Sequence, residues 1–143
     1  MTDYRNILLV VDLSDDSEII GERAKSIADR VGAEITLLHV VEYVPVEPMG
    51  EALLPTIQIE SELVDRARAR LKELAEKLGL GHRPLLVETG GIKTEIIRAA
   101  QRLRSDLIVL GSRERHGLAI LLNFTEDAVL HAAPCDVLAV RLH

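Results

Sequence analysis

The chain has 143 residues, which fits one domain, and residues 1–143 are expected to form a single unit. Hydrophobic residues make up 48% of it, but only two tyrosines and one phenylalanine are aromatic, so the core must be aliphatic. The formal net charge of −6 argues against nucleic acid and anionic membranes as general partners, because like charges repel.

Cysteine content and apolar run length narrow the class of protein. The single cysteine, Cys135, excludes an internal disulfide and a cysteine metal cluster. The apolar run Ile7–Val11 is too short for a signal peptide or a membrane span. We therefore expect a soluble, cytoplasmic protein.

The first part of the chain predicts a strand followed by a helix. The run "NILLVVDLS" indicates a buried strand over about Arg5–Val11. Ser14 or Asp15 is then expected to cap a helix that ends at Gly32. Apolar residues at spacings of three and four give this helix one buried stripe: Ile20, Ala24, Ile27, Ala28 and Val31.

The middle of the chain predicts a strand, an irregular loop and a helix. "AEITLLHVV" is rich in β-branched residues, which favours a second strand. Three prolines between Glu42 and Pro55 predict a loop over that whole range. A helix should follow and end at Gly79 and Gly81. Its stripe is Leu63, Ala67, Leu71, Leu74 and Leu78.

The last part continues the same alternation. "RPLLVET" predicts a third strand, and the glycine pair after it opens a helix with Ile96, Ala99, Ala100 and Leu103 inward. "SDLIVLG" predicts a fourth strand that stops at Gly111. A helix over about Leu118–His131 and a fifth strand, "CDVLAVRL", complete the pattern.

Alternation of strands and helices predicts an α/β fold: an open parallel sheet with right-handed crossovers and helices on both faces. Ligands of such sheets bind beyond the carboxyl ends of the strands, where the strand order reverses. We call this edge of the sheet the rim. Its predicted residues are Asp12, Val40 to Glu42, Thr89 to Gly91 and Gly111 to Arg115.

Four segments together resemble the universal stress protein family in its small, single-domain form. They are "ILLVVDLS", "LLHVVE", "SDLIVLGSR" and "AVLHAAPCDVLAV", and the resemblance covers essentially the whole chain. It implies a five-stranded parallel sheet of order 3-2-1-4-5, similar to adenine nucleotide alpha-hydrolase and Rossmann folds. It also implies a cytoplasmic homodimer that serves in surviving stress rather than in a known catalytic reaction.

One branch of this family binds ATP through Gly-x-x-Gly, nine residues, then Gly-Ser or Gly-Thr. Glycines let the backbone approach phosphate oxygens, and a hydroxyl and a helix N-terminus add donors. Aligned with this motif, Gly111 is the first glycine and Thr125 supplies the hydroxyl. Glu114 and Phe124 replace the other two glycines. The chain therefore resembles the branch of the family that lacks the ATP-binding glycine motif.

Both replacements disfavour a triphosphate. The Glu114 carboxylate would oppose phosphate charge at a cost on the order of one to a few kcal/mol at intermediate dielectric. Phe124 would fill space that the backbone must leave open. The residues of this degenerate nucleotide-binding site are Asp12, Val40, Gly111, Arg113 and Thr125.

Other candidate residues have simpler interpretations. Asp12 corresponds to an aspartate that contacts the adenine or ribose side in the ATP-binding branch, but a capping or rim carboxylate is the alternative. His39 is expected to be a satisfied core residue and Cys135 an inert thiol. The turn "ETGGIKTE" matches no phosphate motif, and no metal site is expected from the histidine spacing.

The fifth strand is expected at an edge of the sheet, where an apolar strand invites pairing with another chain. The family's dimers use this strand, which places Val137, Leu138, Ala139, Val140 and Leu142 in a homodimer interface.

The leading hypothesis is a non-enzymatic stress protein without a cofactor, which acts as a homodimer on protein partners that the sequence does not identify. The alternative is a sensor that binds AMP or ATP weakly in a residual adenosine pocket. An enzyme ranks last, since the sequence shows no nucleophile–base pair or metal cluster.

Overall fold

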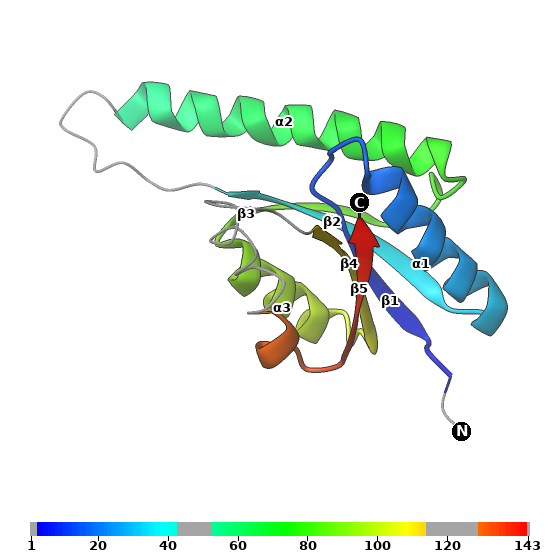
Figure 1. Cartoon of the computed structure of the whole chain (residues 1–143). Coiled ribbons are helices and arrows are strands. Elements are labelled where there is room, and N and C mark those ends of the chain that lie inside the picture. The colour runs from blue at the N-terminus through cyan, green and yellow to red at the C-terminus, as the bar shows by residue number, and fades with distance from the viewer. Residues whose placement is uncertain (1–2, 43–52, 114–128, 143) are drawn as a thin grey trace.

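The computed structural model describes residues 3–42, 53–113 and 129–142, and it contains one five-stranded sheet (Figure 1). The strand order is β3-β2-β1-β4-β5, and every neighbouring pair is parallel, which confirms the predicted topology. The strands are β1 (Asn6–Val10), β2 (Glu34–Glu42), β3 (Leu85–Gly90), β4 (Leu107–Arg113) and β5 (Asp136–Leu142).

Strand β1 lies at the centre of the sheet and is apolar on both faces. Ile7 and Leu9 belong to one core cluster, while Leu8 between them belongs to a second cluster on the opposite face. All three are at most 1% exposed. A strand has a side-chain period of two, so a continuous apolar run buries both faces and requires helices on each side.

Two helices cover the first face of the sheet, α1 (Ser17–Val31) and α2 (Leu53–Lys77) (Figure 1). The predicted stripe of α1 is confirmed: Ile20, Ala24 and Ala28 are buried, and Ile27 and Val31 pack partly buried against the same cluster. Gly32 ends α1 in the left-handed region with φ 72°, and its amide donates to the Ala28 carbonyl.

Helix α2 begins earlier than the sequence predicted. The prolines indicated a loop as far as Pro55, but the helix already starts at Leu53, so Pro55 lies in its first turn. A proline is tolerated there because amides of the first turn have no intrahelical acceptor. The rest of the predicted loop, residues 43–52, lies outside the described residues.

The length of α2 explains one wrong assignment in its apolar stripe. Ala67, Leu71, Leu74 and Leu78 are buried as predicted, but Leu63 is 40% exposed. A helix of 25 residues spans about 37 Å, whereas a nine-residue strand spans about 30 Å. The first turns of α2 therefore extend beyond the strands (Figure 1).

The second face carries α3 (Ile92–Arg102), with Ile96, Ala99 and Ala100 buried as predicted. Leu103 packs partly buried against the same cluster. Residues 129–132 are also helical, and Val129 is fully buried on this face. They overlap the end of the helix predicted over 118–131, and the rest of that prediction, residues 118–128, lies outside the described residues.

Polar contacts fasten the amino-terminal ends of the strands, opposite the rim. The Asp106 carboxylate accepts hydrogen bonds from the amides of Arg5 (2.9 Å) and Asn6 (3.0 Å). The Tyr4 hydroxyl donates to Asp136 Oδ2 at 2.8 Å. These contacts join the beginnings of β1, β4 and β5.

Candidate functional site

The register of the sheet brings three predicted site residues to within one residue of the same level. Val10 pairs with Leu38, and Leu9 pairs with Val109. Val40 is therefore level with Asp12, and Gly111 with the residue before Asp12, on the neighbouring strands β2, β1 and β4. The strand order reverses at this point, because β2 lies on one side of β1 and β4 on the other. The carboxyl ends of these strands form the rim, as the sequence predicted.

Asp12 directs part of its carboxylate into its own turn. Its Oδ1 accepts hydrogen bonds from the Ser14 amide (2.9 Å) and the Ser17 hydroxyl (3.3 Å). The predicted cap at Ser14 or Asp15 is wrong: α1 begins after Asp16, whose side chain makes no cap hydrogen bond. The Asp12 carboxylate organises the entry to α1 instead, which is the structural role considered for it from the sequence.

The backbone on both sides of Asp12 accepts side-chain hydrogen bonds. The Val11 carbonyl accepts from His39 Nδ1 of β2 at 2.8 Å, so this ring nitrogen carries a proton. The Leu13 carbonyl accepts from Arg70 Nη2 of α2. His39 is half-buried and satisfied, in line with the sequence. The role of Arg70 was missed, because no local pattern marks a contact across 57 residues.

Val40 contributes packing rather than a polar group. Its side chain is 7% exposed and belongs to the core cluster under α3. Its backbone pairs in register with Glu88 of β3. Val40 therefore reaches the rim through its position on β2, not through its side chain.

The sequence predicted that the fourth strand stops at Gly111, and this prediction is wrong. The strand continues to Arg113, and Gly111 pairs with Val140 of β5. A Cβ at position 111 would lie 2.6 Å from Ile20 Cδ1 and 3.0 Å from Leu142 Cδ1. A side chain at position 111 would therefore have to displace the ends of the buried Ile20 and Leu142 side chains, so packing favours a glycine here whatever its relation to a ligand.

The remaining predicted residues are placed only in part. Arg113 is the last residue of β4 and pairs with Leu142. Glu114, Phe124 and Thr125 lie outside the described residues.

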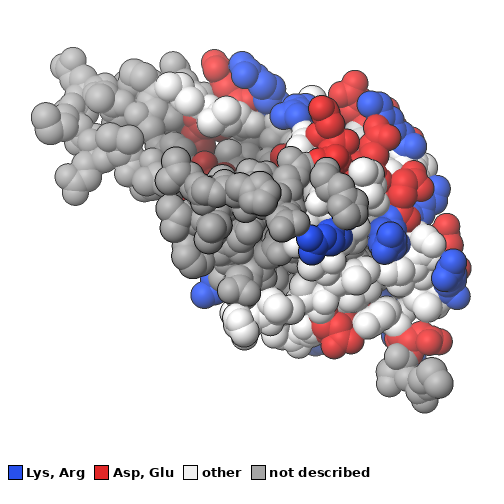
Figure 2. Space-filling view, viewed as in Figure 1, with Lys and Arg blue, Asp and Glu red and all other residues white. Residues whose placement is uncertain are grey.

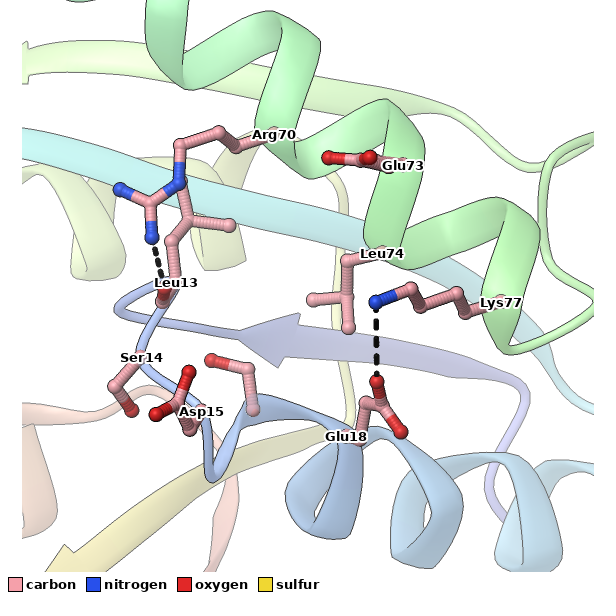
Figure 3. Close-up of a pocket in the computed structure, with 9 residues that line it drawn as sticks. Leu13, Ser14, Asp15, Glu18, Arg70, Glu73, Leu74 and Lys77 are labelled. Atoms are coloured by element: carbon pink, nitrogen blue, oxygen red, sulfur yellow. Dashed lines mark hydrogen bonds and ion pairs between the residues drawn. The ribbon is translucent and has the colours of Figure 1, made fainter.

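A polar cavity of about 360 Å³ lies between the start of α1 and α2 (Figure 3). Arg70 and Lys77 extend into it from α2, and Lys77 Nζ lies 3.6 Å from Glu18 Oε1 of α1. Sequence reasoning did not find this cavity. Its lining is Leu13, Ser14, Asp15, Ser17, Glu18, Arg70, Glu73, Leu74 and Lys77.

Charged residues of both signs are mixed over the face shown in Figure 2. Within the described residues, no group of three or more histidine, cysteine, aspartate and glutamate side chains could hold a metal ion. No helix in that same part combines the length and the apolar character needed to cross a membrane.

A family model for the universal stress protein family matches residues 3–141. The chain belongs to this family. It is 34% identical to universal stress protein A homolog 2 of Coxiella burnetii, over 99% of this chain and 98% of that one.

Solved structures of other universal stress proteins have the same fold as this chain. Universal stress protein UspA from Lactobacillus plantarum superposes with a TM-score of 0.75 at 28% identity, covering 99% of this chain and 100% of that one. A universal stress protein in complex with cAMP gives a TM-score of 0.63 at 19% identity, covering 97% and 98%. The second similarity concerns the fold alone.

Cys135 of this universal stress protein is half-buried at the start of β5, far from the rim. Burial raises the pKa of its thiol, and the negative charges of Asp136 and Asp106 raise that pKa further. Little of the nucleophilic thiolate then forms near neutral pH, which agrees with the inert thiol predicted from the sequence.

The Gly111 contacts predict a destabilised Gly111→Ala variant. The added methyl group would overlap Ile20 and Leu142, and overpacking of this kind costs about 1–3 kcal/mol. Urea unfolding measures the loss. The matched control is Gly81→Ala, whose Cβ would meet Glu76 alone, at 3.4 Å from Cγ and 3.9 Å from Cα, both ordinary contact distances. An equal effect of the two substitutions would contradict this packing role.

The raised thiol pKa predicts slow alkylation of Cys135. Its rate should rise with pH through a midpoint above that of a free cysteine, because only the thiolate reacts. Asp136→Asn removes one negative charge and should shift the midpoint to lower pH. Iodoacetamide labelling followed by mass spectrometry measures the profile, and an unshifted midpoint would exclude the charge effect.

Proposed function

We propose that this universal stress protein is a non-enzymatic homodimer that does not retain a nucleoside triphosphate. Its membership of the family supports the role in stress. Two motif positions support the loss of ATP, since Glu114 and Phe124 stand where the ATP-binding branch has glycine.

The observation that carries the proposal is that Gly111 and Asp12, two of the site residues that survive, have structural reasons for their presence. Gly111 leaves room for the ends of the Ile20 and Leu142 side chains, which pack against β4. Asp12 uses Oδ1 to order the turn before α1. Neither residue therefore requires a nucleotide to explain its presence.

Among the described residues near the rim, His39 has a structural role. His39, beside the end of β1, uses Nδ1 to hold the Val11 carbonyl. We propose that the protein acts through contacts with protein partners or through its abundance, rather than through turnover.

Equilibrium dialysis with labelled ATP tests the loss of the phosphate site. We expect no stoichiometric retention at micromolar ATP, because the sequence puts a carboxylate (Glu114) and a large side chain (Phe124) at the two motif positions where the ATP-binding branch has glycine. Stoichiometric retention would overturn the proposal.

A paired substitution tests whether Glu114 and Phe124 are the reason that ATP is not retained. Glu114→Gly with Phe124→Gly should raise ATP affinity if these two side chains alone close the site. Circular dichroism checks that this variant is folded, since Phe124→Gly also removes a large side chain.

A second candidate function is binding of an adenine ligand with fewer phosphate groups. It is supported by the relative in complex with cAMP and by the exposed position of Asp12 at the rim. AMP and cAMP in the same dialysis experiment separate the two candidates. Retention of either, without ATP, favours the second.

We propose that the dimer forms through β5, which is the last strand in the described sheet. Strand β5 offers different groups on its two faces. Val140 and Leu142 are buried in the core of their own chain, so they support the strand rather than contact a partner. Ala139 is exposed, and Val137 and Leu138 are half-buried.

The β5 proposal predicts that Ala139→Lys weakens the dimer. A lysine placed at a strand–strand interface must lose hydration without a partner charge, which should raise the dimer dissociation constant at least about tenfold. Sedimentation equilibrium measures this constant. Ala69→Lys, at an exposed alanine of α2, is the matched control. The proposed interface would be contradicted if both substitutions raised the dissociation constant equally, or if neither changed it.

A further inference from the structure

The β1–α1 turn, Val11 to Ser17, contains a residue in an unfavourable backbone conformation. Leu13 has φ 64°, in the left-handed region where the Cβ of an L-residue crowds the carbonyl oxygen. A bulky residue stays there only when its surroundings hold it. The turn that carries Asp12 is therefore not set by its own sequence alone.

Two elements distant in sequence hold this turn. Arg70 of α2 donates to the Leu13 carbonyl, and His39 of β2 donates to the Val11 carbonyl at 2.8 Å. The Leu13 side chain is 7% exposed and packs in the core below α1 and α2. The carbonyls on either side of Asp12 are thus restrained from two directions.

The Arg70 contact matters because the space around it is not filled by apolar packing. Arg70 and Lys77 lie two turns apart on α2, so they project from the same face. Between them and the start of α1 lies the 360 Å³ polar cavity, which Figure 3 shows bordered by the Arg70–Leu13 and Lys77–Glu18 contacts. A charged donor forms a stronger hydrogen bond than a neutral one. Beside this cavity, the Arg70 hydrogen bond links α2 directly to the turn.

We infer that Arg70 is a positioning residue, which holds Leu13 in its left-handed conformation and thereby sets the position of the Asp12 carboxylate at the rim. Without this hydrogen bond, Leu13 relaxes towards negative φ, and the peptide groups on both sides of it rotate. The Ser14 amide then leaves Asp12 Oδ1, since that 2.9 Å hydrogen bond spans Leu13. Helix α2 therefore sets, through Arg70, where the Asp12 carboxylate lies at the rim.

Backbone amide exchange, measured by NMR on the full chain, tests the inference without any ligand. Arg70→Met keeps the aliphatic stem but removes the donors. It should speed exchange of the Ser14 amide roughly tenfold, while amides in β1 and the middle of α1 remain unchanged. Arg70→Lys, which keeps one charged donor, should restore part of the protection. Arg68→Met is the matched control, at an exposed arginine of the same helix.

A second measurement concerns the ligand and rests on the second candidate function. If the wild-type protein retains AMP, Arg70→Met should raise its dissociation constant about tenfold at an unchanged thermal midpoint, and Arg68→Met should not. If the wild type retains no adenine nucleotide, that candidate function fails, and amide exchange alone decides the role of Arg70. The inference would be overturned if the Ser14 amide of Arg70→Met exchanged at the wild-type rate, or if Arg68→Met accelerated that exchange equally.

Discussion

Strand β1 lies between β2 and β4 and must be apolar on both faces. Ile7 and Leu9 face α1 and α2, whereas Leu8 faces α3, so one short run of residues belongs to two cores. Two consequences follow. Helices are required on both sides of the sheet, and the chain must cross from one side of β1 to the other. That crossing creates the rim, where the carboxyl ends of the neighbouring strands β2, β1 and β4 lie side by side.

Two residues at the rim illustrate how packing and binding can demand the same side chain. A glycine at position 111 fits a phosphate loop, but the packing of Ile20 and Leu142 also favours a glycine there. An aspartate at position 12 fits recognition of adenosine, but its hydrogen bonds to Ser14 and Ser17 organise the turn before α1. A family resemblance at such positions therefore shows common ancestry of the fold more securely than a common ligand.

The β1–α1 turn connects the rim to α2 more directly than the sheet does. Its left-handed Leu13 packs its side chain in the core and is held by a hydrogen bond from Arg70, beside a polar cavity between the start of α1 and α2. Strain at this turn is thus balanced by a residue 57 positions away along the chain. A change at either end of that contact alters the other, although neither belongs to the nucleotide motif.

The sequence by itself determined the order of elements, the parallel sheet and most of the buried stripes, because these depend on periodicity within a few residues. Its errors arose where one local signal competed with another: Pro55 indicated a loop but fits a first helical turn, and Leu63 continued a stripe that runs beyond the sheet. Only the tertiary structure decided why position 111 is glycine and what holds Leu13. Both answers are contacts between residues far apart in the chain, Ile20 with Gly111 and Arg70 with Leu13, which no local pattern encodes.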